Sequence, residues 1–221
     1  MDLLRTPDEC FEDLPGFPFS PHYVEVPSGD GDRAVRIHHL DEGPADAPTV
    51  LLLHGEPTWS YLYRKMIPVL VDAGFRCIAP DLVGFGRSDK PARREEVTYA
   101  RMVEWLRAAL FDELDLRDLT YVGQDWGALI GLRLVAENPD RYARVVLSNG
   151  GLPTGDQRVG PAFMSWLEFS QTAEEFPIGG IVSGGCTTPL SPEEVSAYDA
   201  PFPEERYKEA HVAKVMDCNW K

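Results

Sequence analysis

The sequence predicts an α/β protein in which a mostly parallel sheet is flanked by helices and followed by a helical lid. Between residues 49 and 148, short apolar runs alternate with segments whose apolar residues recur at helical spacing. This alternation is typical of parallel strands joined by crossover helices. After residue 151 the alternation stops, and proline, glycine and aromatic residues become frequent. We therefore expect residues 1–150 to form the core and residues 151–221 to form the lid.

Each expected element follows from a local pattern. Short apolar runs bounded by turn residues predict strands at residues 22–26, 34–40, 49–53, 75–79, 119–123 and 144–148. Amphipathic spacing predicts helices at residues 60–73, 98–114, 127–137, 161–170 and 192–198. Thr98 is expected to cap the second of these helices, because a threonine side chain can accept a hydrogen bond from the first turn.

Composition narrows the possible functions. The chain has 36 acidic and 21 basic residues, a formal net charge of −15 that repels nucleic acids. The N-terminal segment is acidic where a secretion signal needs bases, and no apolar run approaches the length of a membrane span. We expect a cytoplasmic protein without a nucleic-acid or membrane partner, and nothing in the sequence indicates a metal or an organic cofactor.

The segment Gly123-Gln-Asp-Trp-Gly127 lies between a predicted strand and a predicted helix. It has the form of the nucleophile elbow of α/β-hydrolases, in which glycines permit a tight and strained turn. Its central residue is Asp125, a carboxylate that is ionised at neutral pH and can attack an electrophilic carbon to form an ester. The alternative interpretation of this segment is an ordinary aspartate that caps the next helix.

A second motif, His54-Gly-Glu-Pro-Thr-Trp-Ser-Tyr-Leu-Tyr-Arg64, directly follows a predicted strand. In the α/β-hydrolase fold, this loop and the residue after the nucleophile each give a backbone N–H to the oxyanion hole. The two donors would be Glu56 and Trp126. We expect His54 to support the loop rather than act as a base, and Asp81 to organise hydrogen bonds.

Together with the segment from Ala79 to Pro91, these motifs resemble haloalkane dehalogenases of the subgroup with glutamate after His-Gly, over roughly residues 1–210. The resemblance implies that the chain hydrolyses small halogenated aliphatic substrates with water, to an alcohol and a halide, through an ester on Asp125. It also implies that Trp126 and a lid tryptophan, Trp166, donate indole N–H groups to the departing halide. An indole N–H suits this role because it donates and cannot accept.

The sequence departs from the family after the lid. The order of the triad on this fold is nucleophile, acid, histidine, and the resemblance places the last two after the lid. Only His211 follows Asp125, and its segment predicts a solvent-exposed histidine on a helix. We therefore expect a C-terminally truncated chain that lacks the last strands and helix, has an exposed edge at residues 144–148, and is impaired in ester hydrolysis.

Two other functions remain open. An epoxide hydrolase also uses an elbow aspartate followed by tryptophan, and Tyr198 or Tyr207 could supply the proton that an alkoxide needs. Glu56 and the lid tryptophan favour a halide as the leaving group. A non-catalytic remnant that binds small apolar ligands is the second alternative, because the later triad residues are not found.

Overall fold

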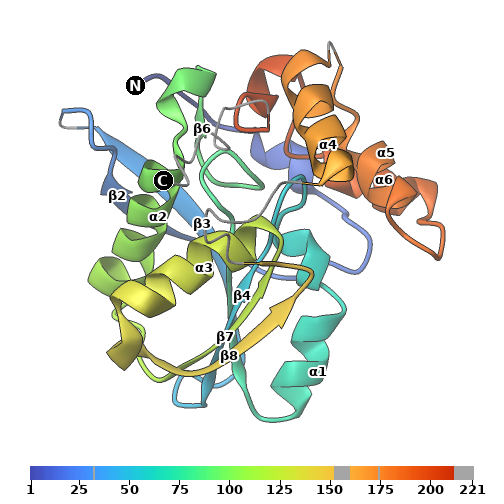
Figure 1. The fold of residues 1–221 in the computed structure, drawn as a ribbon. Coiled ribbons are helices and arrows are strands. Elements are labelled where there is room, and N and C mark those ends of the chain that lie inside the picture. Colours follow the sequence, from blue (N-terminus) through green and yellow to red (C-terminus); the bar gives the residue numbers. More distant parts are fainter. Residues whose placement is uncertain (32, 152–159, 174, 212–221) are drawn as a thin grey trace.

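The computed structural model describes residues 1–31, 33–151, 160–173 and 175–211. Its centre is a six-stranded sheet in the order β2-β3-β5-β4-β7-β8 (Figure 1). The strands are β2 His22–Pro27, β3 Ala34–Glu42, β4 Thr49–Leu53, β5 Arg76–Pro80, β7 Leu119–Gln124 and β8 Tyr142–Ser148. Strands β5, β4, β7 and β8 pair in parallel, whereas β2 and β3 are antiparallel. The prediction of a mostly parallel sheet is confirmed.

The remaining elements surround this sheet. The α-helices are α1 Met66–Asp72, α2 Tyr99–Arg107, α3 Trp126–Glu137, α4 Pro161–Thr172, α5 Ile178–Gly184 and α6 Pro192–Asp199. A small sheet pairs β1 (Leu3–Leu4) with β6 (Lys90–Pro91). Single 3₁₀ turns lie at Asp8–Phe11, Ser60–Tyr63, Arg94–Glu96, Pro139–Arg141 and Glu205–Lys208, and a π-helical turn lies at Ala108–Glu113. Among the described residues, no helix is long and apolar enough to cross a membrane.

Strand β4 is apolar from Val50 to Leu53 because it is buried on both faces. Leu51 and Leu53 belong to a core cluster with residues of α2 and α3. Val50 and Leu52 belong to the opposite cluster, with Ile67 of α1. Since successive side chains of a strand point to opposite faces, one continuous apolar run serves both layers. Figure 1 shows α2 and α3 on one side of the sheet and α1 on the other.

Three helical segments differ from their predictions. The segment 60–73 is divided into a 3₁₀ turn and the short helix α1, and α2 continues as the π-helical turn. Thr98 does cap α2, since its side chain accepts a hydrogen bond from Arg101 N–H at 3.3 Å. Helix α5 was not predicted, because its glycines disfavour an isolated helix. Tertiary packing forms it: Gly179 lies so close to the backbone oxygen of Val195 that no side chain would fit.

The lid helices are held to the rest of the chain by aromatic side chains. Trp59, from the loop after β4, packs with Phe11, Phe176 and Tyr198 in one buried cluster. Its indole N–H donates to the backbone oxygen of Ala197 in α6 at 3.2 Å. Figure 1 shows α4, α5 and α6 gathered beyond one end of the sheet. The division of the chain at residue 150 stays a prediction.

Strand β8 is an exposed edge of the sheet. Within the described ranges it pairs with β7 on one side only, and six of its seven residues are exposed. Its apolar side chains Val145, Val146 and Leu147 are 43%, 49% and 44% exposed. An unpaired strand presents free backbone N–H and C=O groups, and this one adds apolar side chains on both faces.

We expect the 221-residue chain to associate through β8 as its concentration rises. Val146→Lys should weaken this association, because a lysine on an edge strand disfavours edge-to-edge pairing. Sedimentation velocity over a concentration series measures the effect. Val69→Lys is the matched control, since Val69 is 68% exposed but lies on helix α1. A wild type that stays monomeric, or equal effects of both variants, would contradict the prediction.

Candidate active site

Asp125 lies at the sharp turn between β7 and α3, with φ 55° and ψ −124°. A positive φ is unusual for a residue with a side chain, and such strain is found mostly where the surrounding structure enforces it. Its backbone oxygen accepts hydrogen bonds from the N–H groups of Ala128 and Leu129. Gly127 presses against the last carbonyls of β4, where a Cβ atom would collide with the oxygen of Leu53. The elbow is therefore fixed from both sides.

The Asp125 carboxylate points to the loop that follows β4. Its Oδ1 accepts a hydrogen bond from the backbone N–H of Glu56 at 2.8 Å. Burial raises the pKa of Asp125, and the backbone N–H groups of Trp126 and Glu56 oppose this rise. The pKa of a free aspartate, about 3.9, therefore understates the pKa of this buried group. Gly55 lies so close to Asp125 that a Cβ atom there would overlap the Asp125 side chain.

His54 supports the loop from beneath. Its Nε2 accepts the backbone N–H of Leu82 at 3.0 Å, so its Nδ1 carries the proton and donates to Gly55 O at 3.1 Å. The imidazole is fully buried, and burial lowers its pKa. Both ring nitrogens are thus engaged with backbone, which leaves no lone pair to accept a proton from water.

Asp81 joins three segments of the chain in the same region. Its carboxylate accepts the backbone N–H groups of Ser60 at 2.7 Å and Arg87 at 2.8 Å, and lies 2.7 Å from His38 Nδ1. Burial alone would raise the pKa of Asp81, but His38, His54 and the Arg87 N–H together lower it. This geometry is that of a hydrogen-bond organiser.

We expect Asp81→Asn to lower the free energy of unfolding at neutral pH by about 3 kcal/mol or more, because it leaves buried partners unpaired. The pKa of Asp81 in the folded state lies below the unfolded value of about 3.9. At a pH between these two values, the unfolded chain therefore binds more protons than the folded chain. The contribution of Asp81 is complete above the unfolded pKa and is lost as pH falls toward the folded pKa. Urea unfolding at neutral and acidic pH should show the difference shrinking in acid. Asp46→Asn, in an exposed loop, is the control; a difference independent of pH would refute the assignment.

Two tryptophans, Trp126 and Trp166, were predicted to donate indole N–H groups to the departing halide. Trp126 is 5% exposed, and its indole N–H donates to Glu56 Oε2 at 3.1 Å. Trp166 lies on α4, where its ring neighbours among the described residues are Phe169 and Phe176, at centroid distances of 5.8 and 5.9 Å. The two indoles thus belong to different clusters of buried side chains.

The prediction that His211 is solvent-exposed is wrong. The residue is 2% exposed and packs among Phe85, Phe176 and Phe202, with ring centroids 4.6, 5.4 and 4.8 Å away. Its Nδ1 lies 3.9 Å from Glu56 Oε1. No local pattern indicated this position, because the three phenylalanines are distant in sequence and only the fold brings them together.

The tyrosines of the epoxide alternative are buried in the lid cluster. The Tyr198 hydroxyl accepts from Arg64 Nη1 at 3.3 Å, and its ring packs edge-on against Tyr61. Burial raises the pKa of Tyr198, while Arg64 opposes the rise. Tyr207 is 8% exposed in the same cluster. Tyr198 therefore has a structural partner already.

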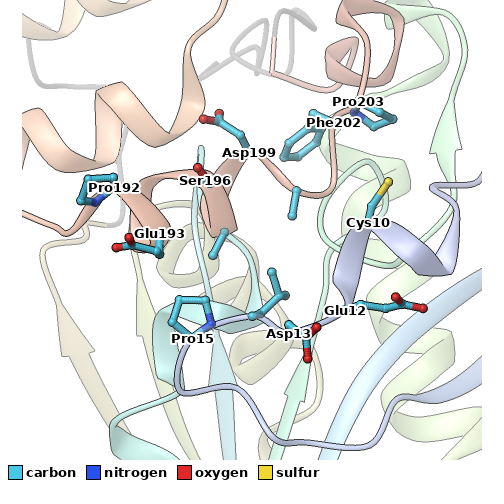
Figure 2. A pocket seen from close by; sticks show the side chains of 13 residues that line it. Cys10, Glu12, Asp13, Pro15, Pro192, Glu193, Ser196, Asp199, Phe202 and Pro203 are labelled. Carbon is cyan, nitrogen blue, oxygen red and sulfur yellow. The ribbon is translucent and has the colours of Figure 1, made fainter.

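A groove of about 730 Å³ lies elsewhere on the molecule, between the N-terminal segment and α6 (Figure 2). Carboxyl groups at Glu12, Asp13, Glu193 and Asp199 lie along it. None of its lining residues belongs to the elbow or to the loop after β4. This groove is separate from the surroundings of Asp125.

Comparison with known proteins agrees with this architecture. Residues 48–177 match the family model described as alpha/beta hydrolase fold, so the chain is an α/β-hydrolase. It is 57% identical over 209 residues to a haloalkane dehalogenase of Psychrobacter cryohalolentis, covering 95% of this chain and 68% of that relative. A haloalkane dehalogenase of Mycolicibacterium paratuberculosis is 52% identical over 208 residues, covering 94% and 68%.

Among solved structures, a tetrameric haloalkane dehalogenase from Paraglaciecola agarilytica superposes with a TM-score of 0.85 at 40% identity. The superposition covers 96% of this chain and 70% of that chain. The chain belongs to the haloalkane dehalogenases, hydrolases that act on carbon–halogen bonds.

Proposed function

We propose that the chain dehalogenates small haloalkanes with Asp125 as the nucleophile. One observation carries the proposal: Asp125 lies on the strained turn at the start of α3, with its carboxylate held by the Glu56 N–H at 2.8 Å. A carboxylate held in this way presents its second oxygen to a substrate. Family membership supports the choice of a carbon–halogen bond as the target.

In the first step, an oxygen of Asp125 attacks the carbon that carries the halogen. A carbon–oxygen bond forms, the carbon–halogen bond breaks, and the halogen leaves with the electron pair as halide. The indole N–H groups of Trp126 and Trp166 stabilise the charge that builds on the halogen. In a dry site such donors act strongly on developing charge. Halides are very weak bases, so this step needs no general acid.

In the second step, water attacks the carbonyl carbon of the ester, the bond from that carbon to the alkyl oxygen then breaks, and the alkyl oxygen leaves as the alcohol after taking a proton, which restores the Asp125 carboxylate. The negative oxygen that forms accepts the backbone N–H groups of Glu56 and Trp126, which already surround the Asp125 carboxylate. This step also requires a general base that takes a proton from water. His54 has no free nitrogen, and His211 faces Glu56. We therefore propose that this 221-residue chain forms the ester faster than it hydrolyses it.

Halide release from a short bromoalkane tests the function directly. The wild type should release bromide, and Asp125→Asn should release none, because an amide is a poor nucleophile. Trp126→Phe keeps the nucleophile and should slow release by about 100-fold, the effect of losing one preorganised donor. Bromide release by Asp125→Asn would sink the proposal. Opening of an epoxide without any halide release would instead favour the epoxide hydrolase alternative.

A further inference from the structure

Three buried polar atoms near the elbow have no hydrogen-bond partner among the described residues: Glu56 Oε1 and both ring nitrogens of His211. The His211 side chain is fully buried and that of Glu56 is 10% exposed. Their nearest atoms are 3.9 Å apart, which is too long for a hydrogen bond. Since buried polar groups are nearly always bonded, this arrangement indicates a second state in which these atoms meet.

The other oxygen of Glu56 occupies the donor that the proposed function gives to the halide. Glu56 Oε2 accepts the indole N–H of Trp126 at 3.1 Å. An indole has one N–H and offers nothing else to an anion. A halide at Trp126 must therefore take this hydrogen from Glu56, and the carboxyl group then needs another partner.

His211 is placed to become that partner. The rings of Phe85, Phe176 and Phe202 surround its imidazole, and its backbone N–H donates to Lys208 O at 2.9 Å. The imidazole is thus fixed with Nδ1 on the side of Glu56. The carboxyl group has to move only about 1 Å to reach hydrogen-bond distance.

The pKa shifts of Glu56 and His211 favour a hydrogen bond between the two side chains. Burial raises the pKa of Glu56 well above its usual value, with Asp125 adding to the rise and Trp126 opposing it. Burial lowers the pKa of His211, with Lys208, Lys90 and His54 acting in the same direction. Both shifts favour the neutral forms of the two groups, and the O–H of a protonated Glu56 is a donor for the lone pair on Nδ1.

We propose that the Glu56 carboxyl group competes with the halide for the Trp126 indole, and that His211 is the positioning residue that receives Glu56 when the halide binds. This inference rests on the proposed role of Trp126. It gives Glu56 and His211 opposite effects on halide affinity. Glu56 occupies the indole N–H of Trp126, whereas His211 binds Glu56 and so frees that N–H for the halide.

Bromide titration of the tryptophan fluorescence measures this affinity, and Trp126→Phe identifies the part of the signal that comes from this site. Glu56→Ala keeps the backbone N–H and frees the indole, so bromide should bind about fivefold or more tightly. His211→Phe keeps the ring and removes its nitrogens, so bromide should bind more weakly by a similar factor. His211→Asn restores an acceptor and should recover wild-type affinity.

The double variant separates positioning from packing. If His211 acts only through Glu56, Glu56→Ala with His211→Phe should bind bromide as Glu56→Ala does. Additive effects, or unchanged affinity in Glu56→Ala, would overturn the inference. Wild-type affinity retained in Trp126→Phe would instead overturn the proposed role of Trp126, and the inference with it.

The pH dependence gives an independent readout. Above its raised pKa, Glu56 becomes a carboxylate that holds the indole more strongly and repels the halide, so bromide affinity should fall as pH rises. Glu56→Gln keeps the acceptor without the charge and should lose this dependence. Asp125 is present in both proteins, so a pH dependence that comes from Asp125 alone should appear in both. Glu95→Gln, at an exposed glutamate, should behave as the wild type. The same pH dependence in Glu56→Gln would count against the inference.

Discussion

Incubation with a bromoalkane is expected to leave this chain carrying one alkyl group on Asp125, with about one bromide released per chain. The reason is the imbalance between the two steps. The nucleophile and the oxyanion donors are together, since Glu56 N–H holds the Asp125 carboxylate at 2.8 Å. In the part of the chain that the structure describes, neither histidine near the elbow is placed as the base for the second step: His54 is engaged with backbone and His211 faces Glu56. The ester should therefore accumulate.

Intact-protein mass spectrometry followed by peptide mapping measures the adduct and its position. Asp125→Asn should gain no mass, which separates the elbow from other carboxylates among the 36 acidic residues. Hydroxylamine, which cleaves esters, should remove the adduct from the wild type. Sustained turnover, with many bromide ions released per chain and no adduct, would show that the chain supplies its own base.

Gly55→Ala is expected to reduce the rate of alkylation by about 100-fold or more, the usual effect of moving a reacting group by about 1 Å. A Cβ at residue 55 would overlap both Cβ and Oδ1 of Asp125. Asp125 cannot withdraw freely, because Gly127 fixes the start of α3 against β4. The carboxylate must therefore leave the Glu56 N–H. The time course of adduct formation by mass spectrometry gives the rate.

Gly184→Ala is the matched control for this substitution. A Cβ at residue 184 meets nothing within 4 Å, and the residue lies at the end of α5 in the lid. It should alkylate at the wild-type rate. Circular dichroism of both variants shows whether the fold is retained. A folded Gly55→Ala protein with a wild-type rate would contradict the close approach of Gly55 and Asp125.

Local sequence was sufficient for the parallel half of the sheet and for the elbow. The strand at Thr49–Leu53 lies at its predicted bounds, because the four apolar residues from Val50 to Leu53 are stable in a row only where both faces are buried. The elbow was visible because Gly123 and Gly127 are required by contacts within a few residues and with the adjacent strand. The edge at residues 144–148 was expected because the family resemblance places further strands after the lid, and β8 does lie at the end of the sheet.

The surroundings of Asp125 could be predicted only in part. The Glu56 N–H was expected from the general plan of the fold, and the structure brings it to the carboxylate. The bond between the Trp126 indole and the Glu56 side chain joins residues 70 positions apart, and no spacing rule links them. Helix α5 similarly depends on tertiary packing, because its Gly179 lies against the backbone of Val195 in α6.

The sequence by itself determined the positions of the parallel strands, the elbow and the identity of the residue on it, because these depend on local periodicity and on backbone shapes that glycine permits. The tertiary structure decided the burial of His211 and the partner of the Glu56 carboxyl group. The burial of His211 depends on Phe85, Phe176 and Phe202 meeting around one imidazole, which only the packing of the lid against the core brings about. The partner of the Glu56 carboxyl group depends on the loop after β4 meeting the start of α3, where the Trp126 indole lies.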